Sequence, residues 1–113
     1  MSGQISLFEQ ARGMVPSLSR GIPCTYILRL RSGGLYVGCS VDCEKRFRDH
    51  EAGTASRTTK ADPPDSLLWI EIHPDFPSGR SREAQIKKWS RAKKLALARG
   101  DLEPLRNLSR SND

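Results

Sequence analysis

Two short segments rich in strand-forming residues flank a glycine pair, and this arrangement constrains the fold more than any other feature of the chain. Residues 24–31 contain the run Thr-Tyr-Ile-Leu, whose side chains favour extended backbone. Residues 35–40 have the character of a return strand. Between them, Ser32-Gly33-Gly34 supplies a turn, because glycine adopts positive φ at little cost. The sequence therefore predicts a β-hairpin.

The hairpin carries both tyrosines of the chain, Tyr26 on the first strand and Tyr36 on the second. Side chains alternate between the two faces of a strand, so a loop of odd length places both rings on one face and a loop of even length separates them. The sequence leaves both registers open.

A helix and a third strand are predicted after the hairpin. Asp42 is a good N-cap for a helix that continues to Ala52, and Gly53 is a good stop. Residues 54–65 are polar and proline-containing, which predicts a loop. Residues 67–73 are apolar enough for a strand at the centre of a small sheet.

Helical segments are predicted toward the C-terminus. Ser81 can cap a helix that carries Glu83 in its first turn, and Ser90 can begin a second helix that ends at Gly100. Pro104 suggests the start of a short terminal helix.

We expect one α+β domain, with a small three-stranded, mostly antiparallel sheet flanked by helices. Residues 1–22 are predicted to be an N-terminal extension with a short amphipathic helix ended by Pro16, available to contact a protein partner. Residues 23–108 form the predicted domain, and residues 109–113 a polar tail.

Charge and cysteine content limit the classes of function. The chain has 113 residues and a net charge of +6, which suggests a polyanionic partner such as nucleic acid. No stretch approaches the ~20 apolar residues of a membrane span, and no signal peptide is evident, so a cytoplasmic location is expected. The three cysteines are expected to be reduced, partly buried thiols, because an odd number without an export signal argues against disulfides.

Arg46 and His50 lie four residues apart and share one face of the predicted helix. The planar fork of arginine donates two parallel hydrogen bonds to a phosphate, and a fixed cation there stabilises the charge that develops at phosphorus under attack. The alternative is a solvated basic face, since Lys45 and Arg48 are charged too.

Glu83, Tyr26 and Tyr36 also have chemistry that suits phosphodiester cleavage. The carboxylate of Glu83 is a hard ligand for magnesium, with water and substrate phosphate completing the shell; alternatively, it interacts with the helix dipole. A tyrosine can position a water or take its proton; alternatively, it packs in the core. The sequence alone leaves these alternatives open.

Taken together, these residues resemble the GIY-YIG nuclease family, most closely its small single-domain, URI-type branch. The first motif of the family falls on Cys24-Thr25-Tyr26, with Cys-Thr in place of Gly-Ile, and the second on Tyr36-Val37-Gly38. The family arginine falls on Arg46 and the family glutamate on Glu83. The basic run of residues 86–94 resembles the tail of the small branch. The resemblance covers residues 23–108.

The resemblance implies a metal-dependent endonuclease that hydrolyses DNA phosphodiesters, with Mg²⁺ or Mn²⁺ on Glu83 and the phosphate held by Arg46. It implies Tyr26 and Tyr36 as active-site tyrosines, of which we favour Tyr26 for activating the water. His50 matches a position that is often histidine and would assist. Gly38 is expected to let backbone pack closely beneath the site.

Little sequence preference is expected, with branched or damaged DNA and a role in repair or recombination as candidate settings. Phosphate contacts position the backbone without reading bases, and they leave RNA open as a substrate. The alternative is a catalytically weak nucleic-acid-binding module or a partner-dependent subunit on the same fold. The residues expected to bind nucleic acid are Arg46, Lys87, Lys88, Arg91, Lys93 and Lys94.

Overall fold

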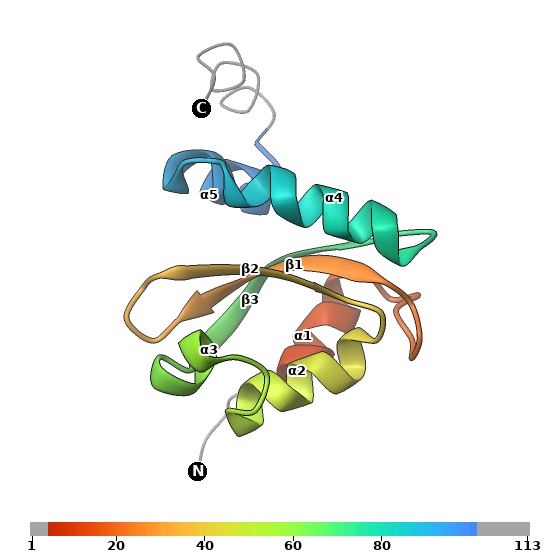
Figure 1. Cartoon of the computed structure of the whole chain (residues 1–113), viewed down its shortest axis with the longest axis horizontal. Coiled ribbons are helices and arrows are strands. Elements are labelled where there is room, and N and C mark those ends of the chain that lie inside the picture. Colours follow the sequence, from red (N-terminus) through yellow and green to blue (C-terminus); the bar gives the residue numbers. More distant parts are fainter. Residues whose placement is uncertain (1–4, 102–113) are drawn as a thin grey trace.

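A three-stranded antiparallel sheet forms the centre of the protein in a computed structural model that describes residues 5–101 (Figure 1). The strands β1 (Cys24–Leu30), β2 (Leu35–Ser40) and β3 (Pro64–Ile72) lie in the order β2-β1-β3. The predicted α+β class with a small antiparallel sheet is confirmed. The third strand was expected at the centre, and this is wrong: β1 is central, and all its residues except Arg29 are buried.

The hairpin register places both tyrosines on the same face of the sheet. Tyr26 pairs with Gly38, and Tyr36 pairs with Leu28. Tyr26 and Leu28 are two residues apart, so the rings of Tyr26 and Tyr36 project to one side. The turn has Gly33 at φ 95°, a conformation that favours glycine.

The tyrosine face of the sheet is covered by α1 (Leu7–Met14), α2 (Cys43–Ala52) and α3 (Arg57–Ala61) (Figure 1). Helix α2 begins and ends as predicted, because Asp42 accepts a hydrogen bond from the Lys45 amide and Gly53 adopts φ 79°. Helix α3 lies within the polar segment that was expected to be a loop. The missing signal was its cap, a serine side chain that accepts from the backbone three residues later.

The opposite face is covered by α4 (Phe76–Lys87) and α5 (Arg91–Arg99) (Figure 1). Helix α4 begins six residues earlier than predicted, because Asp75 rather than Ser81 caps it. As a result, Glu83 lies well inside the helix and not in its first turn, so the dipole alternative for this carboxylate is wrong.

Helix α5 is capped by Ser90 and ends at Gly100, as predicted. The terminal helix predicted from Pro104 lies outside the described residues.

Two hydrophobic clusters hold these layers on the sheet. On the tyrosine face, Tyr26, Phe47 and Leu67 are buried together with Leu7 and Ala11 of α1. The apolar face of α1, in the described part of residues 1–22, therefore packs against the core of the protein. On the other face, Ile27, Val37 and Ile86 form a smaller cluster, against which the partly buried Trp69 and Trp89 pack. None of the helices within residues 5–101 is long and apolar enough to cross a membrane.

Cys24 of β1 and Cys43 at the start of α2 are joined in a disulfide, and their Cα atoms are 6.4 Å apart. This differs from the expectation of three reduced thiols. The sequence did not indicate the pair, because the contact depends on how α2 crosses β1 and not on the 19-residue separation. Cys39 is a free thiol.

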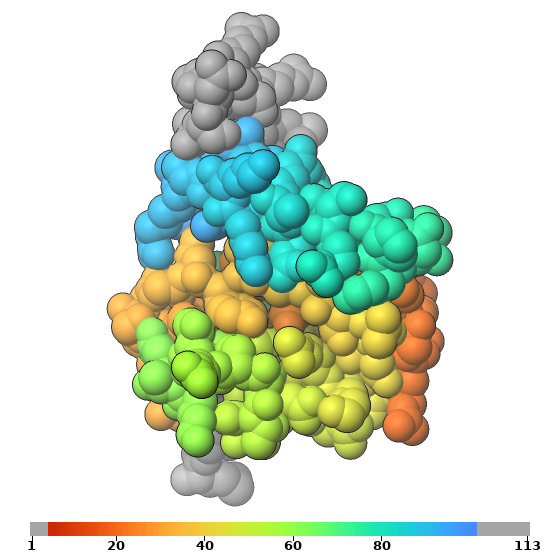
Figure 2. Space-filling view, in the orientation of Figure 1, coloured from red at the N-terminus to blue at the C-terminus, as the bar shows by residue number. Residues whose placement is uncertain are grey.

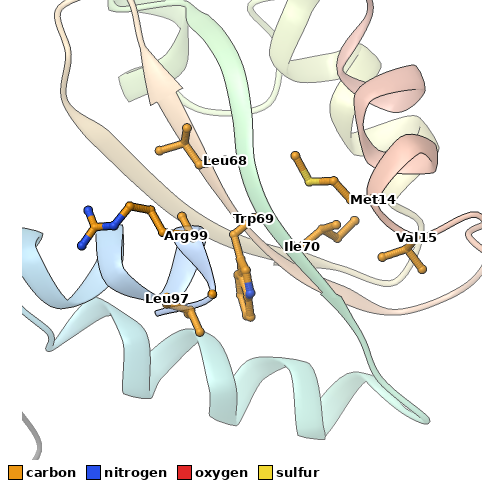
Figure 3. A pocket seen from close by; sticks show the side chains of 9 residues that line it. Met14, Val15, Leu68, Trp69, Ile70, Leu97 and Arg99 are labelled. Atoms are coloured by element: carbon orange, nitrogen blue, oxygen red, sulfur yellow. The ribbon is translucent and has the colours of Figure 1, made fainter. Parts of the chain in front are cut away.

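An apolar pocket of about 390 Å³ lies at the β3 edge (Figure 3). It is lined by Met14 and Val15 at the end of α1, Trp69 and Ile70 of β3, and Leu97 of α5. Its lining contains neither the two tyrosines nor the predicted carboxylate. The predicted site residues lie instead around β2, at the opposite edge of the sheet.

Candidate active site

Helix α2 and the hairpin bring four of the predicted residues together on one face of the sheet. Tyr26 comes from β1, Tyr36 from β2, and Arg46 and His50 from successive turns of α2. The His50 ring is the centre of the group, with ring centroids 5.6 Å from that of Tyr26 and 5.2 Å from that of Tyr36, both edge-on. We call these four residues the tyrosine cluster.

Tyr26 is fully buried, and its hydroxyl is 2.7 Å from His50 Nε2. Its ring packs edge-on against Phe47, at 5.0 Å between centroids. The register partner, Gly38, lies directly beneath it: a Cβ at this position would be 2.7 Å from the Tyr26 hydroxyl oxygen. Only glycine leaves room for the phenol here, which gives a structural reason for the glycine of the second motif.

Burial sets the charge states inside the tyrosine cluster. Burial, and secondarily the neighbouring Tyr36, raise the pKa of Tyr26 far above its usual value, although Arg46 opposes the shift. Burial and the charge of Arg46 lower the pKa of His50 to about 4. At neutral pH the Tyr26 phenol therefore keeps its proton and the imidazole is uncharged.

Arg46 is half-buried, and its Nε is a buried donor without a hydrogen-bond partner among the described residues. Such an unsatisfied guanidinium N–H is unfavourable unless another oxygen binds there. A phosphate oxygen is a suitable acceptor, since it would satisfy the donor and match the positive charge.

Glu83 approaches β2 from the opposite side of the sheet, on α4. Its hydrogen bonds and ion pairs are with Cys39, whose thiol donates to Oε1 at 3.3 Å, with Lys87 Nζ at 3.1 Å and with Arg80 Nε at 3.6 Å. None of these partners belongs to the tyrosine cluster. The structure thus brings four of the five predicted catalytic residues into one group and places Glu83 across the edge strand β2 from them.

The edge strand β2 separates the tyrosine cluster from Glu83. β2 has a neighbour on one side only, and its alternate residues point to the two helical layers. Figure 2 looks onto this edge, and the surface there is indented between α4 and the layer of α2 and α3.

Cys39 is a site residue that sequence reasoning did not identify. Burial raises the pKa of its thiol to about 11, and the contact with Glu83 acts in the same direction. The thiol thus stays protonated and donates to the carboxylate. Strand alternation was the available signal, because the neighbour of Gly38 must face the α4 layer.

The basic residues predicted to bind nucleic acid are not equivalent. Lys88 is exposed, Lys87 pairs with Glu83, and Arg91 donates to the Gly33 carbonyl at 2.8 Å. Lys93 is 4% exposed, and its ammonium lies 4.3 Å from the centre of the Trp89 ring. Lys93 is therefore not placed to contact a phosphate backbone. Lys94 is partly buried.

Within residues 5–101, no group of three or more His, Cys, Asp or Glu side chains could hold a metal ion alone. Zinc, which prefers a full set of protein ligands, does not fit Glu83. A hard cation such as magnesium does fit, because it binds through one or two carboxylates and takes its other ligands from water and phosphate.

Comparison with known proteins identifies the family. The GIY-YIG catalytic domain matches residues 22–96. UPF0213 protein XAC3202 of Xanthomonas axonopodis pv. citri is 41% identical over 71 residues, which cover 63% of this chain and 70% of the relative. A UPF0213 protein of Syntrophus aciditrophicus is 39% identical over 79 residues, which cover 69% of this chain and 91% of the relative. No solved structure gives a significant match.

The chain belongs to the GIY-YIG family, and its UPF0213 relatives place it in the small single-domain branch of that family. Membership supports a nuclease, that is, a hydrolase that acts on nucleic acid, and nucleases of this family generally use a divalent metal. The names of the relatives state nothing about substrate, metal or cellular role.

Proposed function

We propose that this protein is an Mg²⁺-dependent endonuclease that hydrolyses DNA phosphodiester bonds with little sequence preference. The tyrosine cluster carries the proposal: two phenols, an uncharged imidazole and an arginine with an unsatisfied buried N–H lie together beside an exposed strand edge. A packing role alone does not account for an unsatisfied guanidinium N–H in such a group.

In this proposal Arg46 binds the scissile phosphate and stabilises the charge that develops in the transition state. Tyr36 is the partly exposed phenol and is the one placed to orient the attacking water. Tyr26 was favoured for this role from the sequence, but its side chain is fully buried and its pKa is raised by burial. We therefore assign Tyr26, with His50, to holding the cluster in position.

Glu83 would hold the divalent ion. When bound, such an ion polarises the phosphoryl group and stabilises the leaving oxygen. The chain contributes one carboxylate, the Cys39 thiol that orients it, and the neighbouring cations Lys87 and Arg80. Those cations would pair with substrate phosphate once the carboxylate binds the ion.

Binding of the flanking backbone falls to exposed cations of the α4–α5 layer, chiefly Lys87, Lys88 and Arg91. Phosphate contacts of this kind fix position without reading bases, which is why we propose little sequence preference. A cytoplasmic location and a role in repair or recombination on branched or damaged DNA complete the proposal.

A nicking assay tests the proposal, with supercoiled, linear and branched DNA in Mg²⁺ or Mn²⁺. Arg46→Ala should reduce the cleavage rate by about 100-fold or more, as expected for loss of a transition-state donor. Arg48→Ala is the matched control, because this exposed arginine is on the same helix and forms an ion pair with Glu44 instead of contributing to the tyrosine cluster. Glu83→Gln should abolish the metal-dependent cleavage of DNA.

Equal cleavage by Glu83→Gln and wild type would refute the metal assignment. Salt-dependent DNA binding by a folded wild-type protein that cuts none of these substrates would support the alternative of a nucleic-acid-binding module.

A further inference from the structure

Two hydroxyl groups at helix α3, those of Thr59 and of its N-cap Ser56, extend the tyrosine cluster, and neither residue was predicted from the sequence. Thr59 is fully buried, and its Oγ1 lies 3.0 Å from His50 Nδ1. The same oxygen lies 2.9 Å from Ser56 Oγ, which also accepts the Thr59 amide at 3.1 Å. A chain of hydrogen bonds therefore joins Ser56, Thr59, His50 and Tyr26.

The direction of donation along these hydrogen bonds follows from which groups can accept a hydrogen. Burial raises the pKa of Tyr26, so its phenol keeps its hydrogen, and the neighbouring Arg46 has only donors and cannot accept it. The phenol hydrogen then has one acceptor among the neighbours that the structure describes, His50 Nε2. The opposite direction would leave this hydrogen in a buried site without a partner.

The rest of the chain is then determined. An uncharged imidazole that accepts at Nε2 carries its hydrogen at Nδ1, and this hydrogen points to Thr59 Oγ1. The Thr59 hydroxyl must in turn donate to Ser56 Oγ, whose second lone pair accepts the Thr59 amide. Each donor from Tyr26 to Thr59 then has an acceptor, and the bonds run from Tyr26 toward Ser56.

We propose that Thr59, held by Ser56, is a positioning residue that fixes His50 as the Nδ1–H tautomer, so that Nε2 accepts the Tyr26 hydroxyl and the phenol oxygen remains turned to Arg46. Arg46, the proposed phosphate ligand, would thereby be oriented by residues outside the tyrosine cluster. The effect on cleavage rests on the proposed nuclease function. The tautomer of His50 does not, and it can be measured without any substrate.

Nuclear magnetic resonance of the ¹⁵N-labelled full chain tests the proposal, because correlations from the imidazole ring protons distinguish the two tautomers. The chain has two histidines, and His73→Gln assigns the signals. Thr59→Val keeps the side-chain shape and removes the acceptor, while Thr59→Ser keeps the hydroxyl. Thr58→Val is the matched control, since Thr58 is the exposed neighbour in the same helix.

Wild type, Thr59→Ser and Thr58→Val should all show the Nδ1–H tautomer. Thr59→Val removes the acceptor of the Nδ1 hydrogen, so the Nε2–H form should become populated beside the Nδ1–H form. A wild-type Nε2–H tautomer, or a Thr59→Val protein with the wild-type tautomer, would overturn the proposal. Should Thr59→Val fail to fold, Ser56→Ala gives the same test: without its acceptor, the Thr59 hydroxyl turns to donate to Nδ1, and the tautomer should again shift.

In the nicking assay, Thr59→Val should lower kcat about tenfold with little change in KM, and Thr59→Ser should restore most of it. A merely structural role would lower the melting temperature without changing the tautomer. A wild-type protein that cuts no DNA would refute the proposed function, whereas the tautomer result would stand on its own.

Discussion

Gly38 links the hairpin register to the placement of a single hydroxyl group. A Cβ here would lie 2.7 Å from the Tyr26 oxygen and 2.8 Å from the ring carbon that carries it, and His50 holds that hydroxyl in place. We expect Gly38→Ala to lower stability by about 1–3 kcal/mol, as overpacking in a core does, and to reduce cleavage. Urea unfolding measures the first effect and the nicking assay the second.

Gly13→Ala is the control for this substitution, because nothing lies within 4 Å of a Cβ at that position in α1. It should leave stability unchanged or raise it by about 0.5–1 kcal/mol, since alanine favours a helix. Equal loss of stability in both variants would contradict the steric explanation for Gly38.

His50 should make the protein sensitive to acid. Its ordinary pKa is 6.5, and burial and Arg46 lower the pKa to about 4 in the folded state. Between these values the unfolded chain binds a proton that the folded protein does not, so stability should fall as the pH drops from 6.5 to 4. The loss attributable to this group is about 2–3 kcal/mol.

The pH effect can be measured by urea unfolding of wild type and His50→Gln at several pH values. The wild-type free energy of unfolding should decline more steeply across this window than that of the variant. The ring-proton titration of His50 should also have its midpoint well below 6.5. Parallel pH profiles, or a midpoint near 6.5, would show that the imidazole is not desolvated.

At the residue scale, the sequence could identify side chains whose spacing is local and could not identify those that meet through the fold. Arg46 and His50 share a face because they lie one helical turn apart, so the sequence alone predicts that they are neighbours. Thr59 reaches His50 only because α3 folds back beneath α2. Cys39 reaches Glu83 only because α4 crosses β2. Neither contact has a signature in linear spacing.

At the element scale, helix caps decided which boundaries were predictable. The caps at Asp42 and Ser90 and the stops at Gly53 and Gly100 were all found from residue type. The start of α4 was missed, because two prolines favoured a loop where one of them occupies the first turn. The central strand was misassigned, because a strand packed on both faces is apolar wherever it lies in a sheet.

The two candidate caps of α4 can be compared directly. Asp75 Oδ1 accepts the Ser78 amide at 2.8 Å, whereas Ser81 is an exposed residue inside the helix. Asp75→Ala should therefore reduce the free energy of unfolding by about 1 kcal/mol. Ser81→Ala should change it by less than about 0.5 kcal/mol. A larger loss from Ser81→Ala in urea unfolding would mean that the helix begins where the sequence alone suggested.

At the scale of the whole molecule, the net charge of +6 overstates the number of cations free to meet a polyanion. Arg82 pairs with Glu71, and its guanidinium carbon lies 5.6 Å from the ring centre of Trp69 and 5.4 Å from that of Trp89. Lys93 is buried on Trp89. Burial and pairing, which composition does not show, decide which charges reach the solvent.

The salt dependence of DNA binding measures how many of these charges contact phosphate. With about four contacts, the affinity should fall roughly 100-fold between 50 and 200 mM salt, because each contact contributes a slope near −0.9.

Lys88→Ala should reduce the slope by about 0.9, since Lys88 is exposed beside the start of α5. Arg12→Ala removes the same charge from α1, which lies on the other face of the sheet, and should leave the slope unchanged. Fluorescence anisotropy over a salt series separates the two variants. Equal slopes would show that binding responds to net charge alone and that the α4–α5 layer is not the contact surface.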